Sequence, residues 1–199
     1  RFRNVTGVQT CALPISVGGE LDEVLRIVEL AADGRSVRDW RGLAVANYSP
    51  SSDAVFYDTP RSLVVNAPNS EPLIEFTTPD DARRPFSLVV TRAHDMYVSL
   101  DGGAFHKKQA GALLADASWS TIGFLDRTEC VAERVFAVRR DALRMSPVPH
   151  AGRTWCFDMR GGFIVTRRAD RSTGRTWRAT VQGNCCIDEF DKMEDADRT

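Results

Sequence analysis

Residues 86–98 read FSLVVTRAHDMYV, and this stretch decides the fold class. An apolar run gives way to five polar or small residues, and a second apolar run follows. Short runs rich in Val, Phe and Tyr that are broken by polar residues are typical of β-strands joined by turns. The stretch therefore predicts two strands, Phe86–Thr91 and Met96–Leu100, with Thr91 and His94 emerging together where the first strand ends.

The same pattern continues on both sides of this stretch. Turn segments such as SPSSD, APNSEP, RGG and RSTG separate the apolar runs. Further strands are expected at Leu43–Tyr48, Ala54–Tyr57, Arg61–Val65, Leu73–Thr77, Arg134–Val138, Thr154–Met159, Phe163–Arg167 and Trp177–Val181. One helix is expected over Lys107–Ala115, where KKQAGALLA has helix-forming composition. Residues 17–30 have apolar residues at helical spacing, although residues 27–30 fit a short strand equally well. The sequence predicts an all-β fold of many short strands.

Composition limits the classes of function. The 199 residues carry 26 Lys+Arg and 27 Asp+Glu, a net charge of -1, which leaves no electrostatic reason to expect nucleic-acid or membrane-surface binding by this domain. No apolar run approaches the ~18 residues of a membrane span, which indicates a soluble protein. The five cysteines lack the spacing of a disulfide framework or a zinc site, so a reducing, intracellular compartment is expected. They are Cys11, Cys130, Cys156, Cys185 and Cys186.

The amino-terminal segment is unlike the rest of the chain. Residues 5–15 read VTGVQTCALPI, which resembles the in-frame translation of a sequencing-library adapter. The resemblance implies that residues 1–16 are an artefact, so we expect the core to give them no support. A signal peptide is the alternative, but polar residues interrupt the apolar region that such a peptide needs.

The carboxyl-terminal segment has a different character again. Residues 185–193 read CCIDEFDKM, a short apolar strand that ends in an acidic pair, and DRT follows at the end of the chain. This string is similar to the Walker B segment of minichromosome maintenance (MCM) replicative helicases. The resemblance implies that Asp188 is the carboxylate on the Mg²⁺ side and Glu189 the one that activates water. A solvated acidic tail is the alternative.

A phosphate-binding loop of the form GxxxxGK[ST] does not occur in these 199 residues. Without its backbone N–H groups and lysine there is nothing to hold ATP, so the chain alone is not expected to be an ATPase. Mg²⁺ and ATP are expected only for an intact host helicase, which would form a ring oligomer and bind DNA. The host implies an intracellular location, nuclear if it is eukaryotic.

Three motifs occur in order between these two ends. They are Thr91-x-x-His94, a segment that carries Asp158 in a strand (WCFDMRGGFIV, 155–165), and a terminal Asn184-Cys185 that abuts the helicase-like segment. Together they resemble the Hint fold of inteins, the self-splicing protein elements. The resemblance covers about residues 33–184 and implies that residues 17–184 form a Hint domain, with the flanking segments as exteins in cis and residues 185–199 as the downstream extein.

The resemblance also implies a role for each motif residue. In inteins an upstream nucleophile takes the acyl group, the first downstream residue accepts it, and the terminal Asn cyclises to release the element. His94 would protonate the departing amine at the upstream junction, and Thr91 would hold the scissile amide. Asp158 would coordinate the steps at the two junctions, Asn184 would cyclise, and Cys185 would be the downstream nucleophile. Splicing itself needs no cofactor or metal.

The chain departs from the family's pattern at both junctions. Gly183 stands where the family usually has a histidine that assists cyclisation, and Gly161-Gly162 replaces another histidine. The upstream nucleophile is not identifiable, since Ser16 is only a nominal candidate and Cys11 belongs to the adapter-like segment. We therefore expect competence only for cleavage at the Asn184–Cys185 bond.

No homing-endonuclease motif occurs between His94 and Trp155, which predicts a mini-intein. Cys130, His106 and His150 lie in this interval without the spacing of metal ligands, and we expect them at the surface or in packing contacts. Two other interpretations remain open: an AAA+ helicase fragment with a non-catalytic β insertion, and an autoprocessing Hint domain of hedgehog or bacterial type. An intein requires the two junction ends to approach each other.

Overall fold

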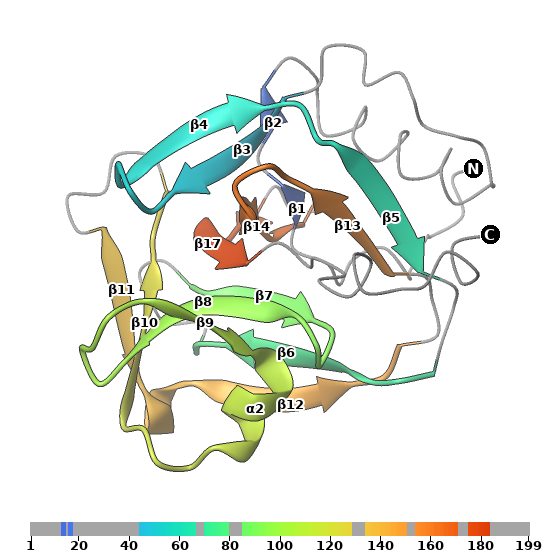
Figure 1. Ribbon diagram of the computed structural model, residues 1–199. Coiled ribbons are helices and arrows are strands. Elements are labelled where there is room, and N and C mark those ends of the chain that lie inside the picture. Colours follow the sequence, from blue (N-terminus) through green and yellow to red (C-terminus); the bar gives the residue numbers. More distant parts are fainter. Residues whose placement is uncertain are drawn as a thin grey trace, which may run out of the picture.

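The computed structural model describes residues 13–14, 16–17, 44–66, 70–79, 85–128, 134–150, 154–170 and 175–183. Within these residues short strands predominate, and helical structure is confined to α2 (Ala110–Ala115) and a 3-10 turn at Arg140–Ala142. The strands form several small sheets that curve around one another, as Figure 1 shows. The all-β class expected from the sequence is confirmed.

The largest sheet contains the strands that carry the motif residues. Its order is β1-β14-β17-β8-β10-β11, and β9 pairs with β8 outside this path. The strands are β1 (Leu13–Pro14), β8 (Asp95–Leu100), β9 (His106–Gln109), β10 (Thr121–Leu125), β11 (Val135–Arg139), β14 (Phe163–Arg167) and β17 (Thr180–Gly183). Strand β17 is therefore held on one edge by β14, which lies shortly before it in the sequence, and on the other edge by the distant β8.

Four smaller sheets complete the described fold, and all their ladders are antiparallel. One has the order β12-β6-β7, a second has β2-β3-β4, and two strand pairs are β13-β5 and β15-β16. The strands are β2 (Ser16–Val17), β3 (Ala44–Ser49), β4 (Ala54–Asp58), β5 (Ser62–Asn66), β6 (Leu73–Thr77), β7 (Ser87–Val90), β12 (Arg144–Val148), β13 (Thr154–Asp158), β15 (Ala169–Asp170) and β16 (Arg175–Thr176).

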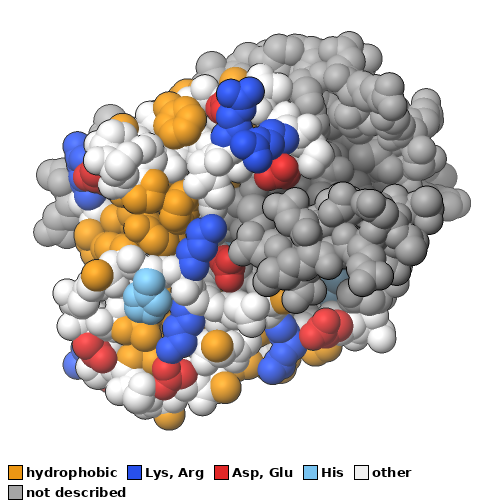
Figure 2. Space-filling view, viewed as in Figure 1, with side chains coloured by type: hydrophobic (Ala, Val, Ile, Leu, Met, Phe, Trp, Pro, Cys, Tyr) orange, Lys and Arg blue, Asp and Glu red, His pale blue; other side chains and the backbone are white. Residues whose placement is uncertain are grey.

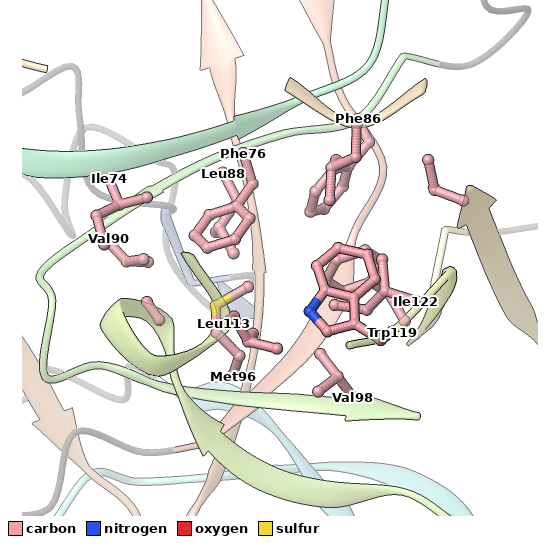
Figure 3. Packing of buried hydrophobic residues seen from close by; sticks show 14 residues of the cluster. Ile74, Phe76, Phe86, Leu88, Val90, Met96, Val98, Leu113, Trp119 and Ile122 are labelled. Carbon is pink, nitrogen blue, oxygen red and sulfur yellow. The ribbon is translucent and has the colours of Figure 1, made fainter. Parts of the chain in front are cut away.

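The main hydrophobic core lies between β6, β7, β8, β10 and α2. Figure 3 shows aliphatic and aromatic side chains from all these elements meeting there. Phe86 and Phe124 are fully buried, and their ring centroids lie 4.6 Å apart. Burial of each side chain of this size stabilises the fold by about 1.5–3 kcal/mol. This core fixes β7 and β8, the two strands that flank Thr91 and His94.

Strand β8 shows why the chain folds locally as the sequence indicates. Met96 and Val98 are buried in the main core, whereas Tyr97 packs against a second cluster that contains Tyr48 and Val181. Alternate residues of a strand face opposite sides of a sheet, so a strand with apolar residues at every position requires cover on both faces. The apolar run that begins at Met96 therefore becomes an interior strand.

Several boundaries differ from the sequence prediction. The predicted helix begins only at Ala110, because His106–Gln109 form β9, which pairs with β8. The predictions also missed β10 and β12, which contain Gly123 and Pro147, residues more typical of turns. Strand β12 tolerates a proline because it is an edge strand, where a missing N–H breaks no central ladder.

The ends of the described fold also bring corrections. The sequence predicts a last strand at Trp177–Val181, but β17 spans Thr180–Gly183. The expectation that residues 1–16 lack support is wrong in part, since Leu13–Pro14 pairs with β14 and Ser16 pairs with Val45 of β3. The adapter-like origin of this segment stays a prediction, and the region predicted as either helix or strand lies outside the described residues beyond Val17.

The described surface carries charges of both signs. On the face in Figure 2, basic and acidic side chains are interspersed, and no large patch of one sign forms among the coloured residues. Three consecutive apolar side chains of β4 are exposed, namely Val55, Phe56 and Tyr57. No described helix has the length and apolar character needed to cross a membrane.

Candidate functional site

The Thr91-x-x-His94 motif forms the tight turn between β7 and β8. The backbone N–H of His94 donates a hydrogen bond to the carbonyl oxygen of Thr91 at 3.1 Å, which closes the turn. Thr91 is half-buried, and the His94 side chain is only 8% exposed. The structure therefore places a hydroxyl and an imidazole at the end of a buried strand, as the sequence predicts.

The start of α2 fixes the backbone of this turn. The Ala110 N–H donates to the His94 carbonyl at 2.9 Å, and the Gly111 N–H donates to the Arg92 carbonyl at 2.8 Å. A Cβ atom at position 111 would lie 3.2 Å from that Arg92 oxygen, so glycine permits the close approach. The two hydrogen bonds hold the turn against the helix, and His94 is thereby attached to a rigid part of the fold.

The end of β17 lies against the other side of the same turn. Gly183 pairs with Phe163 of β14, and Gln182 pairs with Met96 of β8. A Cβ atom at position 183 would lie 2.6 Å from the Asp95 Cβ and 2.8 Å from the Asp95 carbonyl oxygen. Gly183 is thus packed directly on the residue that follows His94. It is the last residue of a buried strand rather than part of an ordinary turn.

Asp158 lies on a different sheet. It is the half-buried last residue of β13, and its carbonyl oxygen accepts a hydrogen bond from the Arg61 N–H at 2.8 Å. A turn closed by a 3.0 Å hydrogen bond from the Gly162 N–H to the Met159 carbonyl then leads into Phe163, the partner of Gly183. The structure therefore brings the Thr91–His94 turn and the end of β17 together, and it places Asp158 on the separate β13-β5 pair.

The remaining sequence-predicted residues have separate outcomes. Asn184, Cys185, Asp188 and Glu189, with Cys11 and Cys130, lie outside the described residues. His106 is exposed on β9, and its Nδ1 lies 3.1 Å from the Ala104 carbonyl oxygen. His150 is buried after β12. Within the described part of the chain, His, Cys, Asp and Glu side chains form no group of three suited to a metal ion.

The sequence analysis missed an aromatic cluster beside Gly183. The Phe163 ring lies 4.7 Å from the Tyr97 ring and 5.9 Å from the Tyr48 ring, measured between centroids. The Lys107 ammonium lies 4.9 Å from the centroid of Phe163. These residues come from four strands, β3, β8, β9 and β14, and their contacts are long-range. A single sequence carries no signal for them.

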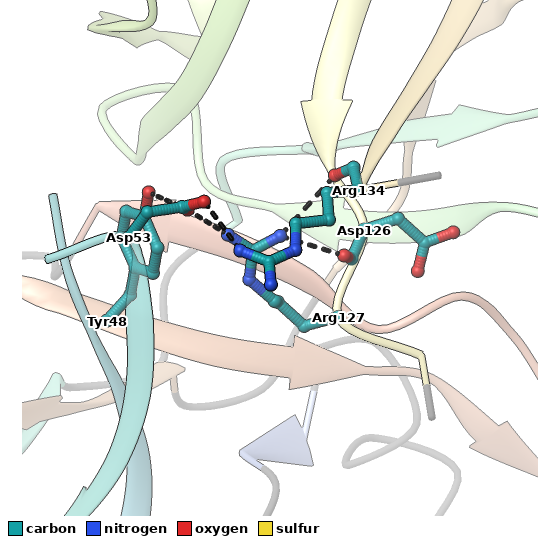
Figure 4. A network of polar contacts seen from close by, with 5 residues as sticks. All are labelled: Tyr48, Asp53, Asp126, Arg127 and Arg134. Atoms are coloured by element: carbon teal, nitrogen blue, oxygen red, sulfur yellow. Dashed lines mark hydrogen bonds and ion pairs between the residues drawn. The ribbon is translucent and has the colours of Figure 1, made fainter. Parts of the chain in front are cut away.

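A network of polar contacts connects this cluster to the hairpin β10–β11 (Figure 4). Asp53, in the β3–β4 turn, accepts hydrogen bonds from the Tyr48 hydroxyl at 2.8 Å, from Arg127 at 2.6 Å and from Arg134 at 2.7 Å. The Arg127 guanidinium also lies 5.0 Å from the centroid of the Tyr48 ring. We call these four residues the Asp53 network, and it links two sheets through one carboxylate.

The Asp53 network shifts the proton affinity of two of its members. Burial, followed by the hydrogen bond to the Asp53 carboxylate, raises the pKa of Tyr48 to about 12. The hydrogen bond from Tyr48, assisted by Arg134 and Arg127, lowers the pKa of Asp53. Asp53 is therefore an anion at neutral pH, which is the form that holds both arginines.

Comparison with known proteins identifies the fold. No protein-family model and no curated protein matches this chain in sequence. The structure is similar to that of a KlbA intein precursor from Methanococcus jannaschii, with a TM-score of 0.58, 11% identity, and coverage of 89% of this chain and 90% of the other. It is also similar to a splice-inactive variant of the AceL NrdHF class 3 split intein, with a TM-score of 0.53, 12% identity, and coverage of 72% and 83%.

These similarities confirm the Hint fold expected from the motif order. The structural similarity extends over most of each chain. The sequence identity is too low for the role of any residue to be assigned from these proteins. The fold is therefore that of inteins, and the chemistry must be argued from this chain's own site.

Proposed function

We propose that the chain is a protein-splicing element whose remaining activity is cleavage at the Asn184–Cys185 bond. The observation that carries the proposal is the contact between Gly183 and Asp95. Asn184 is bonded to Gly183, and consecutive Cα atoms lie 3.8 Å apart across a trans peptide bond. The strand that leads to Asn184 therefore ends against the residue that follows His94, which supports a shared site for the two junction motifs.

The atoms and protons of the proposed cleavage step balance without any reactant from outside the chain. The Asn184 side-chain nitrogen attacks its own backbone carbonyl carbon, which forms a cyclic imide and breaks the bond to the Cys185 nitrogen. The side-chain nitrogen loses a proton, and the departing amine gains one. No oxidant, metal or cofactor enters this balance, and the products are a chain that ends in the imide and the peptide 185–199.

His94, Thr91 and Asp158 serve the upstream junction in this proposal. An imidazole both donates and accepts protons near neutral pH, which suits His94 for protonating a departing amine. Thr91 holds the scissile amide beside it, and Asp158 coordinates the two junctions. Cys185 accepts the acyl chain when an upstream nucleophile is present, because a thiolate is strongly nucleophilic.

We further propose that the element interrupts Walker B of an MCM helicase, with its flanks acting as exteins in cis. Support comes from the string CCIDEFDKM, in which Asp188 and Glu189 are the acidic pair. The residues of this chain do not fit Mg²⁺-ATP by themselves, because a phosphate loop is missing from the sequence. DNA binding, ring assembly and a nuclear or other intracellular location belong to the host in this proposal.

Mass spectrometry of the incubated chain tests the cleavage. Gly183 offers no proton donor in place of the usual histidine, and loss of one such group costs roughly 10²-fold in rate. We therefore expect the peptide 185–199 to appear over hours or longer. The matched control is Asn184→Ala, which should release none.

Two results would contradict the proposal. Equal release from the parent and from Asn184→Ala would indicate ordinary proteolysis. No release from either, over days and at neutral pH, would instead favour a β insertion without chemistry inside a helicase fragment.

His94 has a separate test. In a chain whose upstream junction residue has been restored, His94→Ala should abolish thiol-induced cleavage at that junction and leave the far-UV circular dichroism unchanged. Thiol-induced cleavage at an unaltered rate would remove His94 from its proposed role.

A further inference from the structure

Gln182 is a polar residue in an apolar position. Its side chain is 0% exposed and is the only polar one among the largest fully buried side chains of the described residues. It lies in β17, one residue before Gly183, and faces Met96 on β8 and Ile164 on β14. A leucine or methionine would fill the same volume without placing an amide away from water, so packing does not account for the glutamine.

One end of the Gln182 amide is unused. Its Nε2 donates to the Thr180 hydroxyl at 2.9 Å, and within the described residues its Oε1 has no donor. A buried acceptor without a donor destabilises a folded protein, and such groups are uncommon enough to need an explanation. The Gln182 amide oxygen is therefore a buried acceptor inside the sheet that can take a hydrogen bond from a further donor.

By strand register, the imidazole of His94 is a ring donor on the same side of the sheet as Gln182. Gln182 pairs with Met96, and His94 precedes Met96 by two residues, one position before β8 begins. The alternation of the strand, continued to His94, places it on the same side as Met96. The bond from the Ala110 N–H to the His94 carbonyl continues the β8–β9 register, in which Asp95 pairs with Gln109. Such diagonal neighbours have Cα atoms about 7–8 Å apart, which long side chains bridge.

We propose that Gln182 is a positioning residue for His94. Its Oε1 accepts the imidazole N–H in the reactive conformation and so fixes which ring nitrogen carries the proton, because the hydrogen bond at one ring nitrogen sets the tautomer of the other. The bond to Thr180 holds the amide in the orientation that turns Oε1 away from Thr180. The effect of this hydrogen bond on splicing rests on the function proposed above. The hydrogen bond between Gln182 and His94 does not depend on that function.

The charged groups around His94 are the same in all the variants below. Arg92 and Asp95 lie on its own turn, and Lys108 of β9 pairs with Met96. Lys108 is itself ion-paired with Asp116, with its Nζ 2.5 Å from the carboxylate. If substitution of Gln182 changes the titration of His94, the new side chain at position 182 is therefore the cause.

Nuclear magnetic resonance of the histidine rings in the full chain tests the proposal. In Gln182→Glu a carboxylate replaces the amide, and we expect the midpoint of the His94 titration to move upward by about one pH unit or more. In Gln182→Met the acceptor is lost, and ring ¹⁵N shifts should show a changed ratio of the two neutral tautomers. The exposed His106 is the internal control, and its signals should not move.

An identical His94 titration and tautomer ratio in the parent and both variants would overturn the proposal. If the buried carboxylate of Gln182→Glu prevents folding, the tautomer ratio in Gln182→Met decides alone, because methionine suits a buried site. Neither measurement requires splicing. A chain that fails to cleave but shows the histidine changes would contradict the proposed function and leave the Gln182 contact standing.

Discussion

Replacement of Gly183 by alanine should destabilise the fold far more than a strand glycine normally would. The new Cβ would lie 2.6 Å from the Asp95 Cβ and 2.8 Å from the Asp95 carbonyl oxygen. Both atoms belong to the start of β8 or hang directly from it, so neither can rotate away, and the two strands must separate. Overpacking of this kind costs typically 1–3 kcal/mol, and two simultaneous clashes place the cost near the upper end, about 2–3 kcal/mol.

Thermal unfolding followed by circular dichroism measures this cost. For a chain of 150–250 residues each kcal/mol lowers Tm by roughly 2–4 °C, so Gly183→Ala should lower it by about 4–12 °C. The matched control is Gly123→Ala in β10 of the same sheet. Its Cβ would be crowded only by the Val135 Cγ1 at 3.3 Å, because the Ser99 Cβ and O lie at ordinary contact distances of 3.6 and 3.8 Å. The Val135 side chain is 43% exposed, so it has room to turn away. The control should change stability by less than ~0.5 kcal/mol.

The same contact governs an attempt to repair the junction. Gly183→His would supply the histidine that inteins usually carry before the terminal Asn, yet its Cβ meets the same two atoms of Asp95. We expect Gly183→His to release the peptide 185–199 no faster than the parent. Equal Tm values for Gly183→Ala and Gly123→Ala, or faster cleavage by Gly183→His, would refute the steric argument.

Three further predictions concern the scaffold. Phe124→Ala should cost about 3–5 kcal/mol in urea unfolding, because it empties the centre of the main core; a loss below 1 kcal/mol would contradict the packing described. Asp53→Asn should cost at most about 1 kcal/mol at pH 7, since the carboxylate is half exposed. The pKa of Asp53 is lowered in the fold, so its contribution is present above pH ~4 and lost as pH falls through the folded value; a cost that persists undiminished at pH 2 would count against it. Gly111→Ala should speed hydrogen exchange at the Ala110 N–H, because its Cβ crowds the Arg92 carbonyl at 3.2 Å; unchanged exchange would show that the turn is held by other contacts.

The elements that the sequence predicted well are those whose pattern is local. Strand β8 has apolar residues at successive positions between two turns, and Thr91 and His94 stand at its start, so both the strand and the motif could be recognised. The strands β10 and β12, which contain Gly123 and Pro147, could not be recognised. Gly123 and Pro147 indicate turns by local preference, and only pairing with β8, β11 and β6 makes these segments extended.

The candidate site was predictable in its parts but not in its assembly. The order of the motifs indicated which residues to consider, whereas the contact of Gly183 with Asp95 depends on pairing between residues almost ninety positions apart in sequence. The glycine itself was interpreted as the loss of a histidine. The structure supplies a second reason for it, because position 183 has no room for any side chain.

The central place of β17 has a consequence for the order of events during synthesis. Most sheets of the domain pair an early strand with a late one, as in β5 with β13, β6 with β12, and β8 with β17. Pairings between distant segments form slowly, and none of them can form before the later strand has left the ribosome. Since β17 is the last of these strands, the gap between β14 and β8 stays open until residues 180–183 emerge. The turn that carries His94 therefore acquires β17 as its neighbour only after residues 180–183 have been made. Under the proposed function, translation would delay the chemistry at His94 until this late stage of synthesis.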